Sequence, residues 1–88
     1  MYCYIITLDL NNKENDYSEL VKAIKKLGNC RKALGSCWIV ETTVKSNDIA
    51  RYLSNYIEDD DRLFVGKLSG EATWINVLCE DEWLKDNL

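Results

Sequence analysis

The stretch YCYIITLD at residues 2–9 decides the fold. Aromatic and β-branched residues dominate it, and its length is that of a single strand. Apolar side chains occupy both alternating sets of positions, one being Tyr2, Tyr4, Ile6 and Leu8 and the other Cys3, Ile5 and Thr7. Because alternating side chains point to opposite faces of a sheet, both faces of this strand are apolar. We therefore predict a central strand over residues 2–9.

Two amphipathic helices are predicted in the sequence that follows this strand. After a polar loop at residues 11–15, the sequence DYSE at residues 16–19 has the spacing of a capping box. Apolar residues then recur at helical spacing up to Gly28, which we interpret as a left-handed helix stop. They are Tyr17, Leu20, Val21, Ile24 and Leu27. A second helix begins at Ser46 or Asn47 as its cap and ends in the acidic run at residues 58–61.

The remaining apolar runs predict strands. Residues 30–43 form two strands joined by a turn at residues 34–36, and residues 63–68 form a fourth strand. Residues 74–78 add a short fifth strand, and residues 80–88 are a polar tail or a helical turn. The order strand, helix, strand, strand, helix, strand predicts an α+β class with ferredoxin-like βαββαβ topology. Residues 1–88 then form a single domain, an antiparallel sheet with two helices on one face.

Helices on one face leave the other face of this sheet without a cover. The first strand is nevertheless apolar on both faces, and an exposed apolar face is unusual for a monomer. A chain of 88 residues has room for one core only. We therefore predict that a second copy covers the open face in a two-fold homodimer.

Composition excludes several classes of function. Eleven basic and fifteen acidic residues give a net charge of −4, which argues against binding of long nucleic acids. The chain has no histidine, and this excludes most hydrolase mechanisms. Four cysteines without C-x-x-C spacing are expected to be free, mostly buried thiols that bind no metal: Cys3, Cys30, Cys37 and Cys79. No apolar run approaches the roughly 20 residues that span a bilayer, so we expect a soluble, cytoplasmic protein with no membrane partner.

Five short segments carry a family resemblance, in this order along the chain: residues 7–10, 17–28, 35–40, 60–65 and 68–74. They resemble the SinR-like small proteins of bacteria and phages. That group is related to the smaller CRISPR adaptation subunit, an endoribonuclease-like family that also includes VapD-like proteins. The resemblance implies a ferredoxin-like homodimer.

The resemblance also directs attention to Asp9. In the nuclease-like relatives an aspartate that ends the first strand approaches its two-fold mate and is thought to bind a divalent metal, and Asp9 stands at that position. Paired carboxylates are suitable ligands for Mg²⁺. The other interpretation is that Asp9 ends a strand and caps the polar loop that follows. We favour the second interpretation, because the chain offers no histidine or adjacent lysine to assist catalysis.

Polar and basic groups near strand ends are free to converge on a ligand. The candidate ligand-binding residues are Arg62, Trp74, Ser36, Arg31, Lys32 and Lys67. Arg62 and Trp74 rank first, because they combine charge or stacking capacity with positions in the resembled motifs. The alternative roles are ordinary ones: solvated positions for the basic residues and for the acids at 59–61, and core or dimer interface for the aromatic residues.

Three functions remain open from the sequence. The first is a homodimeric, non-catalytic binding protein for a small nucleotide-like ligand, which in a SinR-like phage protein could be an anti-defence sponge for a nucleotide immune signal. The second is a Mg²⁺-dependent endoribonuclease or nucleotide phosphodiesterase that uses paired Asp9 side chains. The third is a structural or protein-interaction module that binds a partner through its sheet. We expect the first function, with no cofactor.

Overall fold

A four-stranded antiparallel sheet lies at the centre of the structure, a computed structural model that describes residues 1–11 and 17–88. Its strands are β1 (Tyr2–Asp9), β2 (Asn29–Leu34), β3 (Cys37–Thr42) and β4 (Arg62–Leu68). The strand order is β2-β3-β1-β4, so β1 lies inside the sheet and the predicted central strand is confirmed. The predicted hairpin is confirmed as well, because β2 pairs with β3.

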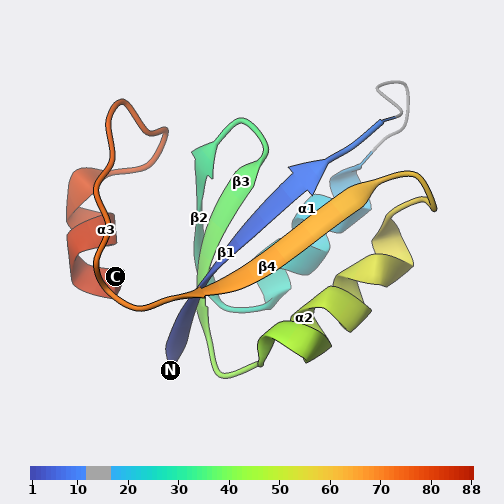
Figure 1. Cartoon of the computed structure of the whole chain (residues 1–88), viewed down its shortest axis with the longest axis horizontal. Coiled ribbons are helices and arrows are strands. Elements are labelled where there is room, and N and C mark those ends of the chain that lie inside the picture. The colour runs from blue at the N-terminus through green and yellow to red at the C-terminus, as the bar shows by residue number, and fades with distance from the viewer. Residues whose placement is uncertain (12–16) are drawn as a thin grey trace.

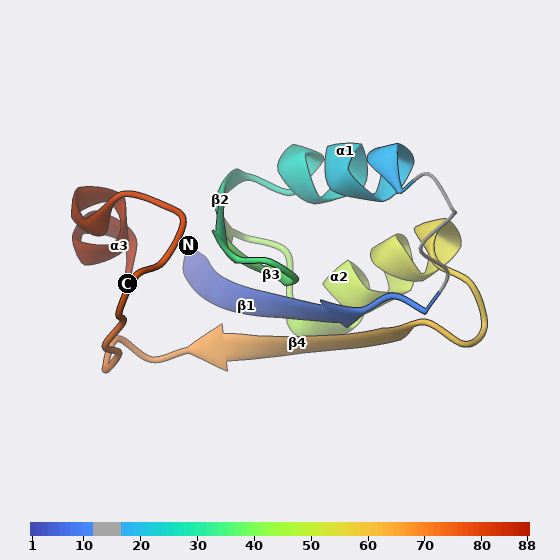
Figure 2. The same cartoon turned by 90° about the horizontal axis from the view of Figure 1, so that it is seen from above.

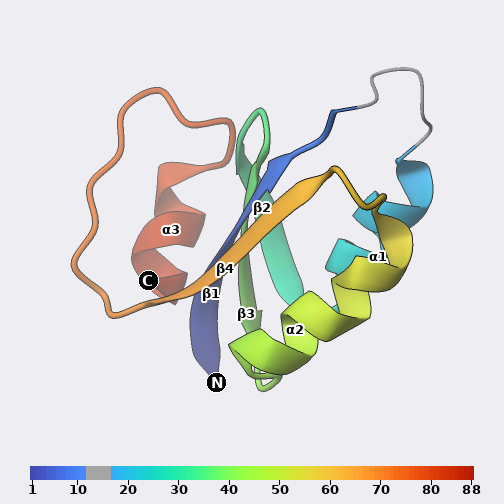
Figure 3. The same cartoon turned by 45° about the vertical axis from the view of Figure 1, so that its right-hand side comes forward.

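Two helices cover one face of this sheet (Figure 1). They are α1 (Ser18–Lys26) and α2 (Ser46–Leu53), and a 3₁₀ turn at Ser54–Tyr56 continues α2. The third helix, α3 (Asp81–Asn87), lies on the opposite side of the sheet, as Figure 3 shows. The predicted α+β class is therefore confirmed, and the arrangement is compatible with a ferredoxin-like fold.

The core under α1 and α2 follows from the two periodicities of the sequence. Tyr4 and Ile6 of β1 point to the same face as their register partners Val40 and Trp38 of β3. Residues on the inner sides of the two helices, such as Ile24, pack against them and are buried. Alternation along the strands and helical spacing along α1 and α2 therefore bring one set of apolar side chains into one core.

Two of the three helix boundaries that the sequence assigned by capping residues need correction, the end of α1 and the start of α2. The predicted cap of α1, Asp16, lies outside the described residues. Gly28 is not in the left-handed conformation, since Gly70 is the one glycine with a positive φ among the described residues. Position 28 requires a glycine because the backbone there passes close to β3, and a Cβ would collide with the backbone oxygen of Glu41. Lys45, not Ser46 or Asn47, is the N-cap of α2.

The C-terminal segment, residues 69–88, also differs from the prediction. Residues 74–78 form no strand, and the left-handed backbone of Asn76, with φ 57°, explains why an extended run is interrupted there. Residues 80–88, predicted as a polar tail or a helical turn, contain the helix α3, in agreement with the second alternative, and Trp83 and Leu84 of this helix are buried. No helix among the described residues is long and apolar enough to cross a membrane.

This segment covers part of the second sheet face, which we define as the face opposite α1 and α2. Trp83 and Leu84 pack there against Cys3, Ala33 and Ile39. The chain itself therefore covers the first half of this face, which leaves the second half for the predicted second copy. In Figure 2, α3 lies beside the beginning of β1, whereas the end of β1 extends away from it.

Candidate functional site

The second sheet face changes from closed to open along β1. Cys3 is buried under α3, Ile5 and Thr7 are half-buried, and Asp9 is exposed. On the neighbouring strand β4, Phe64 pairs with Thr7 and Arg62 pairs with Asp9. We call Thr7, Asp9, Phe64 and Arg62 the open half of the second sheet face. They line a shallow hollow together with Leu8 and Leu63.

Phe64 is the dominant apolar group of the open half. Phe64 is 67% exposed and lies on β4, an edge strand of the sheet. The ring lies close to Gly66 of the same strand, where a Cβ would come 3.0 Å from Phe64 Cε1 and 3.8 Å from Ile5 Cγ2. The missing side chain at Gly66 therefore gives the Phe64 ring space along the sheet.

Asp9 and Arg62 form an ion pair at the end of this face. Arg62 Nη1 donates to Asp9 Oδ2 at 2.8 Å, with side chains that are 74% and 60% exposed. An exposed ion pair of this kind contributes about 0–1 kcal/mol to the stability of the fold, so the fold depends little on it. The guanidinium occupies one oxygen of the carboxylate that the metal hypothesis requires. No group of three or more potential metal ligands occurs among the described residues.

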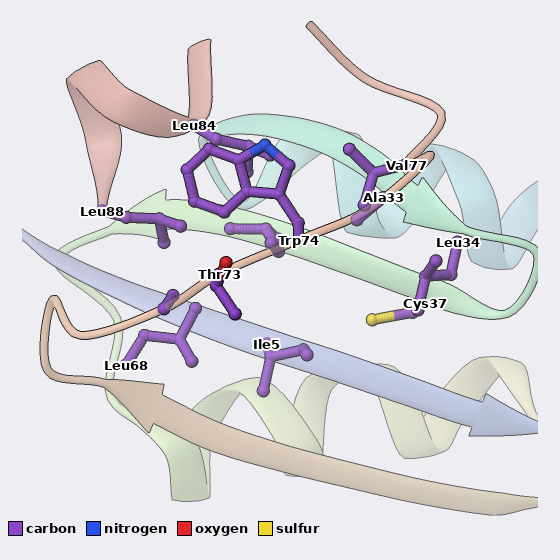
Figure 4. A pocket seen from close by; sticks show the side chains of 12 residues that line it. Ile5, Ala33, Leu34, Cys37, Leu68, Thr73, Trp74, Val77, Leu84 and Leu88 are labelled. Carbon is purple, nitrogen blue, oxygen red and sulfur yellow. The ribbon is translucent and has the colours of Figure 1, made fainter. Parts of the chain in front are cut away.

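An apolar pocket of about 160 Å³ lies between the sheet and the C-terminal segment (Figure 4). Ile5, Cys37 and Ile39 of the sheet line one side, and Trp74 and Val77 of the C-terminal segment line another. No residue that lines the pocket carries a charged side chain. Burial raises the pKa of the Cys37 thiol, which keeps it protonated and a weak nucleophile.

Trp74 lies at this pocket and not at the ion pair. Its Nε1–H donates to Asp81 Oδ1 at 2.9 Å, which fixes the indole against the N-terminal end of α3. Figure 4 shows the ring beside Leu84. The two residues that rank first from the sequence, Arg62 and Trp74, thus line two different hollows of the second sheet face.

The other candidate ligand residues lie in three further places. Arg31 contacts Glu80, with Nε and Oε2 3.5 Å apart, and its guanidinium lies 5.1 Å from the Trp83 ring centroid. Lys67 lies over Tyr2, with its ammonium 4.2 Å from the ring centroid. Lys32 and Ser36 come together, because both line a hollow of about 210 Å³ beside the β2–β3 turn. The structure therefore brings two of the six candidates into one hollow and separates the rest.

Asp61 has a role that the sequence analysis missed. Its carboxylate is buried and accepts backbone N–H groups of Asn11 and Glu58, both at 2.9 Å, and the Tyr17 hydroxyl. The N–H of Glu58 is the main cause of a lowered pKa of Asp61, with those of Asn11 and the Tyr17 hydroxyl adding to it. The interpretation of residues 59–61 as a solvated stop is therefore wrong for Asp61, and three consecutive acids gave no signal of which one is buried.

The four cysteines are free, as the sequence analysis predicted. Cys3 and Cys37 are buried, whereas Cys30 and Cys79 are half-buried. Burial is the main cause that raises the pKa of each of the four thiols. A raised pKa leaves little thiolate at neutral pH, so none of them has the environment of a nucleophilic cysteine.

Comparison with known proteins finds no matching family model and no significant match to a curated protein or a solved structure. The resemblance to SinR-like proteins therefore stays a prediction from the motifs of the sequence.

Proposed function

We propose that this chain is a binding protein that works as a two-fold homodimer, with the open half of the second sheet face as the subunit interface. The observation that carries the proposal is Phe64, a large apolar side chain that is 67% exposed on that face. Apolar groups of this size gain most from removal from water.

Charge supports a second copy of the chain as the partner. Each copy carries a net charge of −4, so two copies repel unless their contact surfaces are locally neutral. Asp9 and Arg62 give the open half one charge of each sign. In a two-fold interface every residue meets the same patch on the partner, so a patch with both signs is complementary to itself.

The size of the chain is compatible with such an interface. A stable interface buries about 800 Å² on each partner, roughly one eighth of the 5990 Å² that this chain exposes. The open half supplies an apolar centre at Phe64 and a charged rim at Asp9 and Arg62. That arrangement matches the usual anatomy of a protein interface.

Charge reversal tests the interface directly. We expect Asp9→Arg and Arg62→Asp, each alone, to weaken dimerisation about tenfold, because like charges then face each other across the two-fold axis. The double variant restores opposite charges within and between subunits, so it should dimerise as the wild type does. Sedimentation equilibrium measures the dissociation constants.

A matched control exists on α2. Asp48 and Arg51 form another exposed ion pair, at 4.0 Å, on the helix-covered side of the sheet. Their reversal should leave the dimer unchanged. Equal effects of the two reversals, or single variants at Asp9 and Arg62 that dimerise normally, would refute this interface.

A nucleotide-like ligand is the second candidate function, and the hollow beside the β2–β3 turn favours it. Lys32 and Ser36 both line that hollow, so an ammonium and a hydroxyl are available to one phosphate group. Calorimetry with cyclic dinucleotides and ADP-ribose derivatives tests it. Binding by the wild type that Lys32→Ala abolishes and the exposed control Lys22→Ala retains would support the candidate; no binding by the wild type would reject it.

The magnesium nuclease is a further outcome of the same experiments. It requires the Asp9 carboxylate to leave Arg62 and to face its two-fold mate. RNA cleavage that EDTA stops and that Asp9→Asn abolishes would put this activity ahead of simple binding.

A further inference from the structure

We propose that the apolar pocket under the C-terminal segment is a binding site for a small, neutral molecule that contains one aromatic ring. The pocket lies between Ile5 on the sheet and Trp74 and Val77 on the segment that crosses it (Figure 4). It is separate from the open half of the face, so this proposal does not depend on the dimer.

The volume of the pocket sets the size of the ligand. At about 160 Å³ it is comparable to apolar protein cavities of about 150 Å³ that stay dry and bind benzene. A nucleotide, with its sugar and phosphate, exceeds this volume. The pocket therefore has room for a single ring with a small substituent.

The lining sets the chemistry of the ligand. Of the residues that line the pocket, Thr73 is the one with a side-chain hydroxyl, and none has a charged side chain. A charged ligand would lose its hydration there without gaining an ionic partner, at a large cost in free energy. A neutral ligand loses no such hydration.

Trp74 makes the site selective for an aromatic ring. The bond from its Nε1–H to Asp81 holds the indole in place at the pocket. Aromatic rings attract each other edge-to-face or offset, beyond the effect of buried area. A ring in the pocket can therefore make a contact with Trp74 that an equally large aliphatic molecule lacks.

A ligand can reach this pocket without opening the sheet. Leu34, Ala72 and Thr73 line the pocket and are exposed, so the pocket meets solvent between the β2–β3 turn and the C-terminal segment. Residues 69–80 form neither helix nor strand. Their backbone contact with the sheet edge is the bond from Leu78 N–H to the Ala33 carbonyl, at 2.9 Å.

Toluene is the probe for this site, and benzoate and methylcyclohexane are its controls. Toluene should shift the methyl NMR signals of Ile5, Val77 and Leu84, and at ten times its dissociation constant it should raise Tm by about 6 °C or more. Benzoate should do neither, and methylcyclohexane should bind several-fold more weakly. Equal binding of methylcyclohexane would overturn the aromatic preference, and binding of benzoate would overturn the requirement for neutrality.

Two variants fill the pocket from opposite sides. Ala33→Leu adds bulk from the sheet and Ala72→Leu adds it from the exposed segment, so the second can fold even where the first does not. Both should abolish the toluene shifts, while the matched control Ala50→Leu on α2 should retain them. Wild-type protein without methyl shifts at millimolar toluene, or shifts that persist in folded Ala72→Leu, would overturn the proposal.

Discussion

Both faces of the central strand β1 are apolar in sequence, but the two faces of the sheet are covered in different ways. On one face, α1 and α2 bury Tyr4 and Ile6 together with their partners on β3. On the other, an irregular segment and a helix of seven residues cover the first half, and Phe64 remains exposed on the second half. Figure 3 shows the sheet between these two unequal layers.

We infer from this difference that the helix-covered face mainly stabilises the fold, whereas the second sheet face mainly offers surface for binding. The helix-covered face is closed by α1 and α2, apart from the hollow beside the β2–β3 turn that Leu20, Lys32 and Trp38 help to line. The second sheet face keeps an apolar pocket and an open half, which are the features that a ligand or a second copy can use. Mutations on the two faces should therefore affect different properties.

The largest effect is expected where the helix-covered face is most tightly packed. Ile6 is fully buried under the helices, and Ile6→Ala should lower the free energy of unfolding by about 4 kcal/mol. Its neighbour Ile5 points to the second sheet face and borders the pocket, so Ile5→Ala should cost less than half as much. Denaturant unfolding measures both, and equal losses would show that the two faces are packed alike.

A smaller loss is expected at the helix that covers the second sheet face. Trp83 of α3 is buried against Cys3 and Ile39, and its Nε1–H donates to Asn29 Oδ1 at 3.2 Å. Trp83→Ala should therefore lower the free energy of unfolding by about 3 kcal/mol. Ile75, 83% exposed in the same C-terminal segment, serves as the control, and Ile75→Ala should be neutral. A neutral Trp83→Ala would mean that α3 is not part of the fold.

The smallest effect concerns acid stability at Asp61. Because its pKa in the folded protein lies below the usual value, its stabilising contribution is complete well above pH 4 and is lost as the pH falls through the folded pKa. Asp61→Asn should lower Tm at pH 7, and the difference from wild type should shrink in more acidic buffer. The exposed Asp59→Asn is the control and should leave the Tm profile unchanged. A constant difference at all pH values would show that the carboxylate charge is not involved.

Sequence alone predicts the elements whose patterns are local. The run of aromatic and β-branched residues at 2–9 predicts β1, and the spacing of Leu20, Ile24 and Leu27 predicts α1. It fails at the C-terminal segment, where residues 74–78 have high strand propensity but Asn76 is left-handed and no strand forms. For α3 the sequence left a polar tail and a helical turn open, because seven residues are too few for a helical period to be recognised.

The candidate site was harder to predict, because its residues are distant in sequence. Arg62 was identified by its charge, but its partner Asp9 follows only from the register between β1 and β4. The pocket beside Trp74 arises from the path of the C-terminal segment across the sheet, which no local pattern contains. The sequence therefore indicated which types of residue are available, whereas the tertiary structure was needed to show which of them are neighbours.

The mass of the protein in solution tests the central claim most directly. Sedimentation equilibrium at micromolar concentration should give twice the 10.2 kDa chain mass for the wild type and for Tyr56→Asp, a control at an exposed aromatic residue after α2. Phe64→Asp should give the mass of a single chain, because a charge then replaces the apolar centre of the interface. A wild type of 10.2 kDa at every concentration, or a dimeric Phe64→Asp variant, would contradict a homodimer built on the open half.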